Sequence, residues 1–470
     1  MLLQKIALKN LSRQKRRSFL LGGALAFGIL ILTLVNGVVG GMLTSIERNF
    51  SNIAVGHIFF TEIERTANGR ILMSIEDDRP LLEAIDRLDI PIRYFARRTM
   101  HDGTLVFAGE SAMRGLAGVD WIEETQIAGT LEMLAGTTEG MAGSDGILLS
   151  EGAAERLRLI PKDKPDAKTM QVWDTLPKPE REAKLAEWRE ARDEAIRRSV
   201  GESILVELST IHGQQNLGEF RVHGIFRTQF DIYAYTDRTV LNRLIGMADD
   251  GYNQFGAFLE DFGQIDLQTV RLYRELASRY DLYPLEKLAG KGLGTAVSDI
   301  RQTGLVGKKF VITNINNELG SFKSIFTTVQ YVAIGFFVVL LLVIMVGITN
   351  TFRIVVYERT REIGTMRALG MQRGSVRSIF LFEALFLSLG GVVVGFALAS
   401  LILFVVGLIK WNIMAELSFF FDGGRLLVTI DPVQFLATVL IVSMLTLLAA
   451  LIPARRAARL EPAHALRTQF

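Results

Sequence analysis

Four long runs without charged residues alternate with polar stretches along the chain. One run lies alone near the N-terminus and three lie in the last third, at Phe19–Ile46, Ser324–Phe352, Ala384–Ile409 and Pro432–Ala454. Each run is long enough to cross a hydrocarbon layer of roughly 30 Å as a helix. The pattern predicts an α-helical membrane protein with four transmembrane helices. Because no Asp, Glu, Lys, Arg or His lies within these runs, the pattern also argues against ion-coupled transport.

The polar stretch between the first two runs has the patterning of a globular domain. Runs of β-branched and aromatic residues predict strands, and periodic apolar positions predict helices. The strands are expected at Val55–Thr61, Gly103–Ala108, Ile204–Ser209 and Phe220–Phe226, and the helices at Pro80–Leu88, Gly152–Leu159 and Asp266–Tyr280. The chain is therefore predicted to carry a large α+β extracytoplasmic domain, big enough for two lobes.

Lysine and arginine residues predict which side of the membrane each segment faces. They are in excess before the first run, after the second run and in the C-terminal tail, but not in the 410–431 connection. Loops with such an excess face the cytoplasm. We expect a multi-pass protein of the cell inner membrane with both termini in the cytoplasm. The predicted segments are a 1–18 interfacial helix, a first span at 19–46, an exterior domain at 47–318, a stalk and second span at 319–352, a cytoplasmic coupling loop at 353–378, a third span at 379–409, an outer loop at 410–431, a fourth span at 432–454 and a cytoplasmic tail at 455–470.

The N-terminal segment has two sides. Leu3, Ala7 and Leu11 share one helical face, and basic residues lie roughly opposite. This predicts a short helix in the inner membrane interface, with a merely basic flank as the alternative. The apolar run that follows is too long for the core of a signal peptide, so we expect an uncleaved anchor.

Several kinds of chemistry have no motif in this sequence. There is no G-x-x-x-x-G-K-[ST] loop for ATP, no H-E-x-x-H motif, no cysteine and no basic tract typical of nucleic-acid binding. The five histidines are scattered. We expect no catalytic residue, no metal site and no cofactor in this chain, and an energy source outside it.

The segment 161–199 is rich in charged residues and has a thin apolar stripe. Acid-before-base pairs four residues apart, such as Glu180 with Lys184 and Glu194 with Arg198, favour a solvated helix. One interpretation is a surface insertion, and the other is a projecting element that docks on an external partner. Glycine pairs at 37 and 41 and at 391 and 395 would allow close helix packing.

The connection after the second run carries the most specific motif. Residues 356–373 read V-Y-E-R-T-R-E-I-G-T-M-R-A-L-G-M-Q-R and lead to F-E-A at 382–384 and a G-G pair at 390–391. This segment resembles the corresponding one in MacB/FtsX-type ABC transporter permeases. Three other stretches are also similar to the corresponding ones of these permeases: the C-terminal stretch at 453–467, the N-terminal pattern at 7–18, and G-L-A-G-V-D at 115–120. The 161–199 segment departs from the family pattern.

The resemblance implies a permease without its own ATPase. In this family the second-to-third connection forms a coupling helix that sits on a separate cytoplasmic ABC ATPase subunit, which binds the ATP and Mg²⁺. From the residues alone, positions 363, 366, 367 and 370 share a narrow face that can insert into a partner, and Gly370 is expected to end the helix. The alternative is that the arginines only set the topology. The predicted ATPase-coupling residues are Glu358, Arg359, Arg361, Glu362, Ile363, Met366, Arg367, Leu369 and Gly370.

The resemblance also implies how the protein works. The exterior domain would have a porter subdomain from about 47–110 and 228–318 and a sabre subdomain from the middle. ATP-driven motion would pass through the stalk by mechanotransmission in a dimer with a second permease copy or a paralogue. The large exterior domain, together with the lack of a fused ATPase in this sequence, favours extraction of lipoproteins from the outer leaflet, as in lipoprotein-releasing permeases. The alternatives are MacB-like export of peptides or antibiotics and an FtsX-like scaffold that regulates cell-wall hydrolases.

A lipoprotein or other hydrophobic cargo requires an apolar surface near the outer side of the membrane. The outer ends of the first two spans would provide it at the dimer interface. The residues predicted to contact substrate are Val38, Met42, Ile46, Phe326 and Val329. Aromatic residues at 419–421 and at Phe50, Phe59 and Phe60 are further candidates.

Overall fold

The computed structural model describes residues 2–13, 15–53, 55–228, 231–303, 307–411, 420–422 and 424–461. The chain divides into two compact units, one of Met1–Ile46 with Ser324–Phe470 and one of Glu47–Lys323. Within the described residues, four helices are long and apolar enough to cross a membrane. They are α2 (Lys15–Ile53), α13 (Gly320–Glu358), α15 (Arg373–Leu408) and α16 (Pro432–Ala458). The predicted fold class is confirmed.

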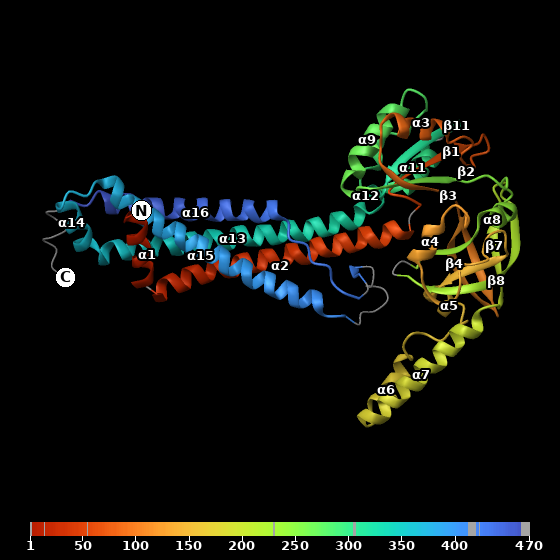
Figure 1. The fold of residues 1–470 in the computed structure, drawn as a ribbon, viewed down its shortest axis with the longest axis horizontal. Coiled ribbons are helices and arrows are strands. Elements are labelled where there is room, and N and C mark those ends of the chain that lie inside the picture. The colour runs from red at the N-terminus through yellow and green to blue at the C-terminus, as the bar shows by residue number, and fades with distance from the viewer. Residues whose placement is uncertain are drawn as a thin grey trace. The chain divides into compact units, whose positions relative to one another are not determined.

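The unit of Met1–Ile46 with Ser324–Phe470, called the membrane unit below, is a bundle of helices (Figure 1). Its long helices share an apolar core. The core residues come from all four long helices and include Leu25, Ile348, Phe380 and Val442. The described part of this unit also contains two shorter helices, α1 (Leu2–Arg13) and α14 (Thr360–Ala368). Ala7 of α1 is fully buried, so the apolar side of this helix is taken up at that point by protein.

Glycines bring α2 and α15 into close contact. A Cβ atom at Gly395 would lie 2.3 Å from the carbonyl oxygen of Ala26, and one at Gly391 would lie 2.9 Å from Leu25 Cβ. A Cβ atom at Gly41 would lie 1.6 Å from the carbonyl oxygen of Leu427. Both predicted glycine pairs therefore include positions where only glycine fits without movement of the backbone.

The other unit contains one continuous network of strands that forms two lobes. The first lobe pairs its strands in the order β11-β1-β10-β3, with β2 on β1. These strands are β1 (Ile58–Arg65), β2 (Ile71–Met73), β3 (Ile92–Phe107), β10 (Gln254–Leu259) and β11 (Gly307–Asn314), with helices α3 (Arg79–Arg87), α9 (Ile265–Leu276), α10 (Leu285–Leu288), α11 (Gly292–Thr303) and α12 (Ile315–Glu318), and the short 3₁₀ helix η1 (Phe262–Gln264).

The second lobe comes from the middle of the unit. The order continues β3-β4-β9-β6-β8-β5, and β7 pairs with β3 and β8. Its strands are β4 (Glu110–Val119), β5 (Glu132–Gly136), β6 (Gly146–Ser150), β7 (Ser203–Ser209), β8 (Gln215–Arg227) and β9 (Tyr233–Asp237), and its helices are α4 (Thr125–Thr130), α5 (Glu151–Arg156), α6 (Ala167–Asp174), α7 (Lys178–Ser199) and α8 (Arg238–Ile245).

The strand β3 belongs to both lobes. Its first half pairs with β10 up to Arg98, and its second half pairs with β4 from Thr99 onward. The predicted return to the first subdomain near residue 228 is wrong, because β9 pairs with β4 and β6 of the second lobe. The chain returns to the first lobe only with β10.

The predicted elements of this unit all overlap observed ones, although their ends differ. The run predicted at Val55–Thr61 is β1, which begins at Ile58 and continues to Arg65. The run predicted at Gly103–Ala108 is only the last part of the 16-residue strand β3. Its first half contains three arginines, which hid the alternating pattern.

The segment 161–199 forms a helical hairpin of α6 and α7, which Figure 1 shows projecting beyond the strands of its unit. Its base is fixed, because Arg192 donates to Glu151, Glu155 and the carbonyl oxygen of Pro161. Further along the hairpin, Trp173 and Trp188 meet edge to face with their ring centroids 6.3 Å apart. The hairpin is therefore an ordered projection on a rigid base.

His57 is expected to make the stability of its unit depend on pH. This unit, Glu47–Lys323, is called the exterior unit below. Its Nδ1 accepts a hydrogen bond from the backbone N–H of Leu259 at 3.0 Å, and burial lowers the pKa of His57 to about 4. In the unfolded chain the pKa is about 6.5. The unfolded state thus binds more protons between these values, so the contribution of His57 to stability is fully present above about pH 6.5 and is lost as the pH falls toward 4.

We expect His57→Asn to flatten this dependence, because the asparagine oxygen can accept the same bond and does not titrate. The measurement is the melting temperature of the full-length protein in detergent between pH 7 and pH 5. His101→Asn, at a half-buried histidine for comparison, controls for loss of an imidazole. Equal slopes for wild type and His57→Asn would contradict the assignment.

Candidate functional site

The helix α14 follows α13 after a sharp corner. Helix α13 ends at Glu358, Arg359 lies between the helices, and α14 runs to Ala368. At its end Gly370 has φ +94°, its N–H donates to Arg367 O at 3.1 Å, and the N–H of Met371 donates to Met366 O at 3.0 Å. This pair of bonds is a Schellman motif, which requires a left-handed residue. The prediction that Gly370 ends the helix is confirmed.

The face of α14 predicted to insert into a partner instead packs on its own bundle. Ile363 is 1% exposed and lies in the apolar core, and Met366 packs against that core. Arg367 Nη1 donates to the carbonyl oxygen of Ala458 at 2.7 Å, at the last residue of α16. The predicted orientation is therefore wrong, because the apolar positions of this short helix cover the end of the bundle.

Two predicted rim residues, Glu358 and Arg359, are also bound within the chain. Arg17 of α2 holds Glu358 with two bonds of 2.6 and 2.7 Å. Arg359 Nη1 donates to Glu383 Oε1 of α15 at 3.1 Å, and Asn10 of α1 donates to the same oxygen at 2.6 Å. These contacts fix the corner between α13 and α14.

The outer face of α14 remains open. Arg361, Glu362, Thr365 and Ala368 are exposed, and the side chain of Leu369 is 84% exposed. An apolar residue that projects among charged neighbours, on a helix held firmly from behind, is typical of a protein contact. Of the predicted residues, Arg361, Glu362 and Leu369 are placed for such a contact.

The predicted cargo residues are only partly accessible. Ile46 is 1% exposed, so it cannot line a surface, whereas Val329 is 45% exposed. Val38, Met42 and Phe326 are half-buried. The structure therefore corrects the prediction for Ile46 and leaves the other four accessible to different degrees.

The aromatic candidates separate in the same way. Phe59 and Phe60 are 6% and 0% exposed and belong to β1, so they cannot meet cargo. Phe420 lies edge to face with Phe326, with ring centroids 5.6 Å apart. Phe419 lies outside the described residues, as does the 462–467 part of the C-terminal motif.

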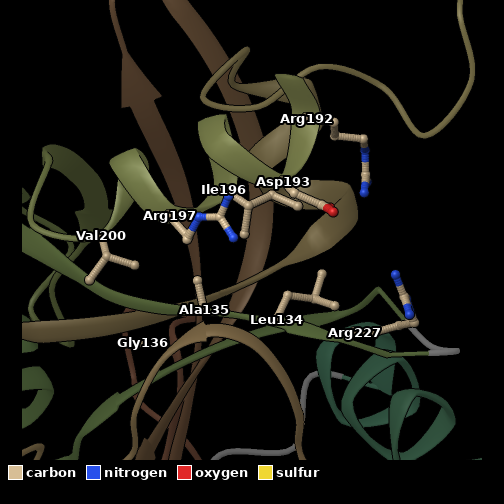
Figure 2. A pocket seen from close by; sticks show the side chains of 9 residues that line it. All are labelled: Leu134, Ala135, Gly136, Arg192, Asp193, Ile196, Arg197, Val200 and Arg227. Atoms are coloured by element: carbon tan, nitrogen blue, oxygen red, sulfur yellow. The ribbon is translucent and has the colours of Figure 1, made fainter. Parts of the chain in front are cut away.

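A groove of about 570 Å³ lies between α7 and β5 in the exterior unit. Figure 2 shows Ile196 and Arg197 of α7 over Leu134 and Ala135 of β5. Two further arginines line it, but Arg192 is paired with Glu151 and Glu155, and Arg227 with Glu132 and Glu151. The charges of these two arginines are therefore balanced within the chain.

Sequence reasoning missed Glu383 and Asn10. The predicted third span at 379–409 contains Glu383, which is 5% exposed and lies inside α15. The available signal was the position of this acid, directly before an uncharged run and close in sequence to a cluster of arginines. A carboxylate at such a place usually has a cationic partner.

Parts of the chain are similar to known proteins. Residues 334–462 match the family model described as FtsX-like permease C-terminal. The chain is 30% identical over 239 residues to the uncharacterized ABC transporter permease YknZ of Bacillus subtilis, covering 48% of this chain and 53% of YknZ. It is 28% identical over 229 residues to the macrolide export ATP-binding/permease protein MacB of Escherichia coli K12, covering 48% of this chain and 33% of MacB.

Two solved structures are also similar. The extracellular domain of YknZ has 12% identity and a TM-score of 0.26, covering 55% of this chain and all (100%) of that domain. The periplasmic region of MacB from Actinobacillus actinomycetemcomitans has 13% identity and a TM-score of 0.28, covering 59% of this chain and 97% of that region.

The matched part of this chain spans about half of YknZ, at 53%, and a third of MacB, at 33%. The matched family domain includes α14, α15, α16 and most of α13. On these sequence matches, residues 334–462 are similar to the C-terminal domain of FtsX-like permeases, and about half of the chain is similar to ABC transporter permeases of the MacB/FtsX type.

Proposed function

We propose that this protein is the permease subunit of an ABC transporter whose ATP is hydrolysed by a separate cytoplasmic subunit. The observation that carries the proposal is the open outer face of α14, where Leu369 is 84% exposed while the inner face packs on the bundle. Because the corner between α13 and α14 is fixed by ion pairs, a partner that pushes on α14 would move α13 as well. The chain itself contributes no catalytic residue and binds neither ATP nor Mg²⁺ in this scheme.

Leu369→Asp is expected to weaken the contact with the ATPase. A buried apolar contact at the centre of an interface is worth about 2 kcal/mol, which corresponds to roughly thirty-fold in affinity. The measurement is the amount of ATPase subunit that copurifies with the tagged permease, together with the ATPase activity of the purified complex.

Met113→Asp is the matched control, because Met113 is a 75% exposed apolar residue of the exterior unit. We expect it to leave copurification and ATPase activity unchanged. Normal copurification and activity of Leu369→Asp would rule out this face of α14 as the contact.

For the substrate, we propose lipoproteins extracted from the outer leaflet of the inner membrane, by a dimer of this permease with a second copy or a paralogue. Withdrawing one acyl chain of about 14 carbons costs roughly 10 kcal/mol, at about 0.8 kcal/mol per CH₂. The ATPase and a receiving apolar surface must together offset that cost. The accessible candidates for this surface are Val38, Met42, Phe326 and Val329.

Photocrosslinkers placed at Met42 and Phe326 test this substrate. We expect both to trap lipoprotein in the nucleotide-free complex and to lose it when nucleotide binds. The same crosslinker at the buried Ile46 is the control and should trap nothing. Trapping of a soluble peptide in place of lipoprotein would favour MacB-like export.

A second candidate function is an exterior scaffold that regulates another protein, such as a cell-wall hydrolase. It is favoured by the projecting α6–α7 hairpin, since Arg192 anchors its base and Val172 near its outer part is 61% exposed. Crosslinks that form only from the 161–199 segment, with none near the membrane, would support this function over lipoprotein extraction.

A further inference from the structure

The carboxylate of Glu383 joins three parts of the membrane unit through one oxygen atom. Its Oε1 accepts from Asn10 Nδ2 of α1 at 2.6 Å and from Arg359 Nη1 at the corner between α13 and α14 at 3.1 Å. The side chain of Glu383 is 6% exposed and that of Arg359 is 11% exposed. Helix α1, the base of α14 and α15 therefore meet at a buried charge pair.

A buried carboxylate restricts the positions of its partners. Withdrawing it from water costs several kcal/mol, and only well-placed partners offset that cost. Any movement of α14 that separates Arg359 from Glu383, or of α1 that removes Asn10, leaves a buried charge less well paired. The three segments are thus held together more strongly than exposed ion pairs would hold them.

Two neighbouring contacts strengthen this arrangement. Ala7, three residues before Asn10 on the same side of α1, is fully buried. Arg17, at the start of α2, holds Glu358 with two bonds directly next to Arg359. The corner between α13 and α14 is therefore held both by the end of α1, through Asn10 and Glu383, and by the start of α2, through Arg17.

We propose that Glu383 is a positioning residue that makes α1 and α14 one mechanical element. When the partner displaces α14, the N-terminal helix moves with it, and α1 is part of the coupling machinery. This inference rests on the proposed function for the identity of the partner. The link itself is a property of the permease alone.

The test measures the distance between α1 and α14 in the full chain in lipid nanodiscs without an ATPase. Spin labels are introduced at Gln4 and Thr365, which are exposed, and the chain has no cysteine to remove. We expect a narrow distance distribution for the otherwise unchanged protein. In Glu383→Ala and in Asn10→Leu, we expect the narrow distribution to be lost and replaced by a broad one.

Two further variants separate positioning from general damage. The exchange Arg359→Glu with Glu383→Arg should restore the narrow distribution, because the charge pair is kept and the amide of Asn10 can turn its oxygen toward an arginine. Arg377→Gln, at an exposed site on α15, should leave the distribution narrow. If Glu383→Ala does not fold, Asn10→Leu decides, since it removes no charge.

An unchanged narrow distribution in both Asn10→Leu and Glu383→Ala would overturn the proposal. Because no ATPase is present, this outcome is independent of the Leu369→Asp experiment. A normal link with failed ATPase binding would instead count against the proposed function. In the complex, we expect Asn10→Leu to keep ATPase copurification and to lose cargo release, because the partner still binds α14 but no longer moves α1.

Discussion

Arg98→Met is expected to destabilise the exterior unit by about 3–5 kcal/mol, as for other buried ion pairs that lose one partner. Arg98 and Glu124 are each 2% exposed, and the Nη2 to Oε2 distance is 2.8 Å. Burial raises the pKa of Glu124, which shows how unfavourable this site is for an unpaired carboxylate. The measurement is chemical denaturation of the full-length protein in detergent, followed by tryptophan fluorescence.

The double variant Arg98→Met with Glu124→Leu should recover most of the lost stability, because neither charge then remains buried. Arg79→Met is the matched control, since its ion pair with Asp77 is 81% and 44% exposed and such pairs contribute at most about 1 kcal/mol. A loss below about 1 kcal/mol for Arg98→Met would contradict the prediction. The position matters because Arg98 ends the pairing of β3 with the first lobe.

Gly320→Ala is expected to keep ATP hydrolysis and to reduce cargo release strongly. Gly320 begins α13, and a Cβ atom there would lie 2.0 Å from the Cα atom of Gly290. Two residues earlier, Glu318 accepts a hydrogen bond from the N–H of Leu293 at 2.5 Å, at the start of α11. The outer end of α13 is thus held to the first lobe, and an added methyl group forces the two backbones apart.

The measurements are ATPase activity, cargo release and hydrogen exchange of the 289–293 segment in the complex. We expect exchange of this segment to rise in Gly320→Ala, since the loop must leave its contact. Gly335→Ala, on the same helix, is the control because nothing lies within 4 Å of its Cβ position. Full cargo release by Gly320→Ala would show that force does not pass through this contact.

The span pattern and the coarse fold were predictable from the sequence, because uncharged runs and alternating apolar residues depend on local composition. The route of the chain between lobes was not. The partner of β3 changes at Arg98, and β9 joins the second lobe by pairing with β4. The pairings of β3 with β10 and of β4 with β9 join residues more than a hundred positions apart, which no local pattern contains.

The candidate site was predictable as a segment but not as a surface. The motif at 356–373 located α14, and Gly370 marked its end. The predicted orientation of the apolar face of α14 was wrong, because periodicity identifies such a face but does not show which part of the protein packs against it. Here Ile363 lies in the apolar core of the bundle, and Arg367 donates to the end of α16. The high exposure of Leu369, an apolar residue off that face, could only be recognised from the structure.

The split origin of the first lobe imposes an order on biosynthesis. Strand β1 ends at Arg65, but its partner β10 begins only at Gln254. At about 5–20 residues per second, the ribosome needs roughly 10–40 s to make the residues between them. During that interval the second lobe is completed first, while β1 and the first half of β3 still lack β10, the strand that lies between them. The first lobe can therefore close only after residue 259 has been made, and mutations that slow the folding of the second lobe extend the period in which these two strand edges are unpaired.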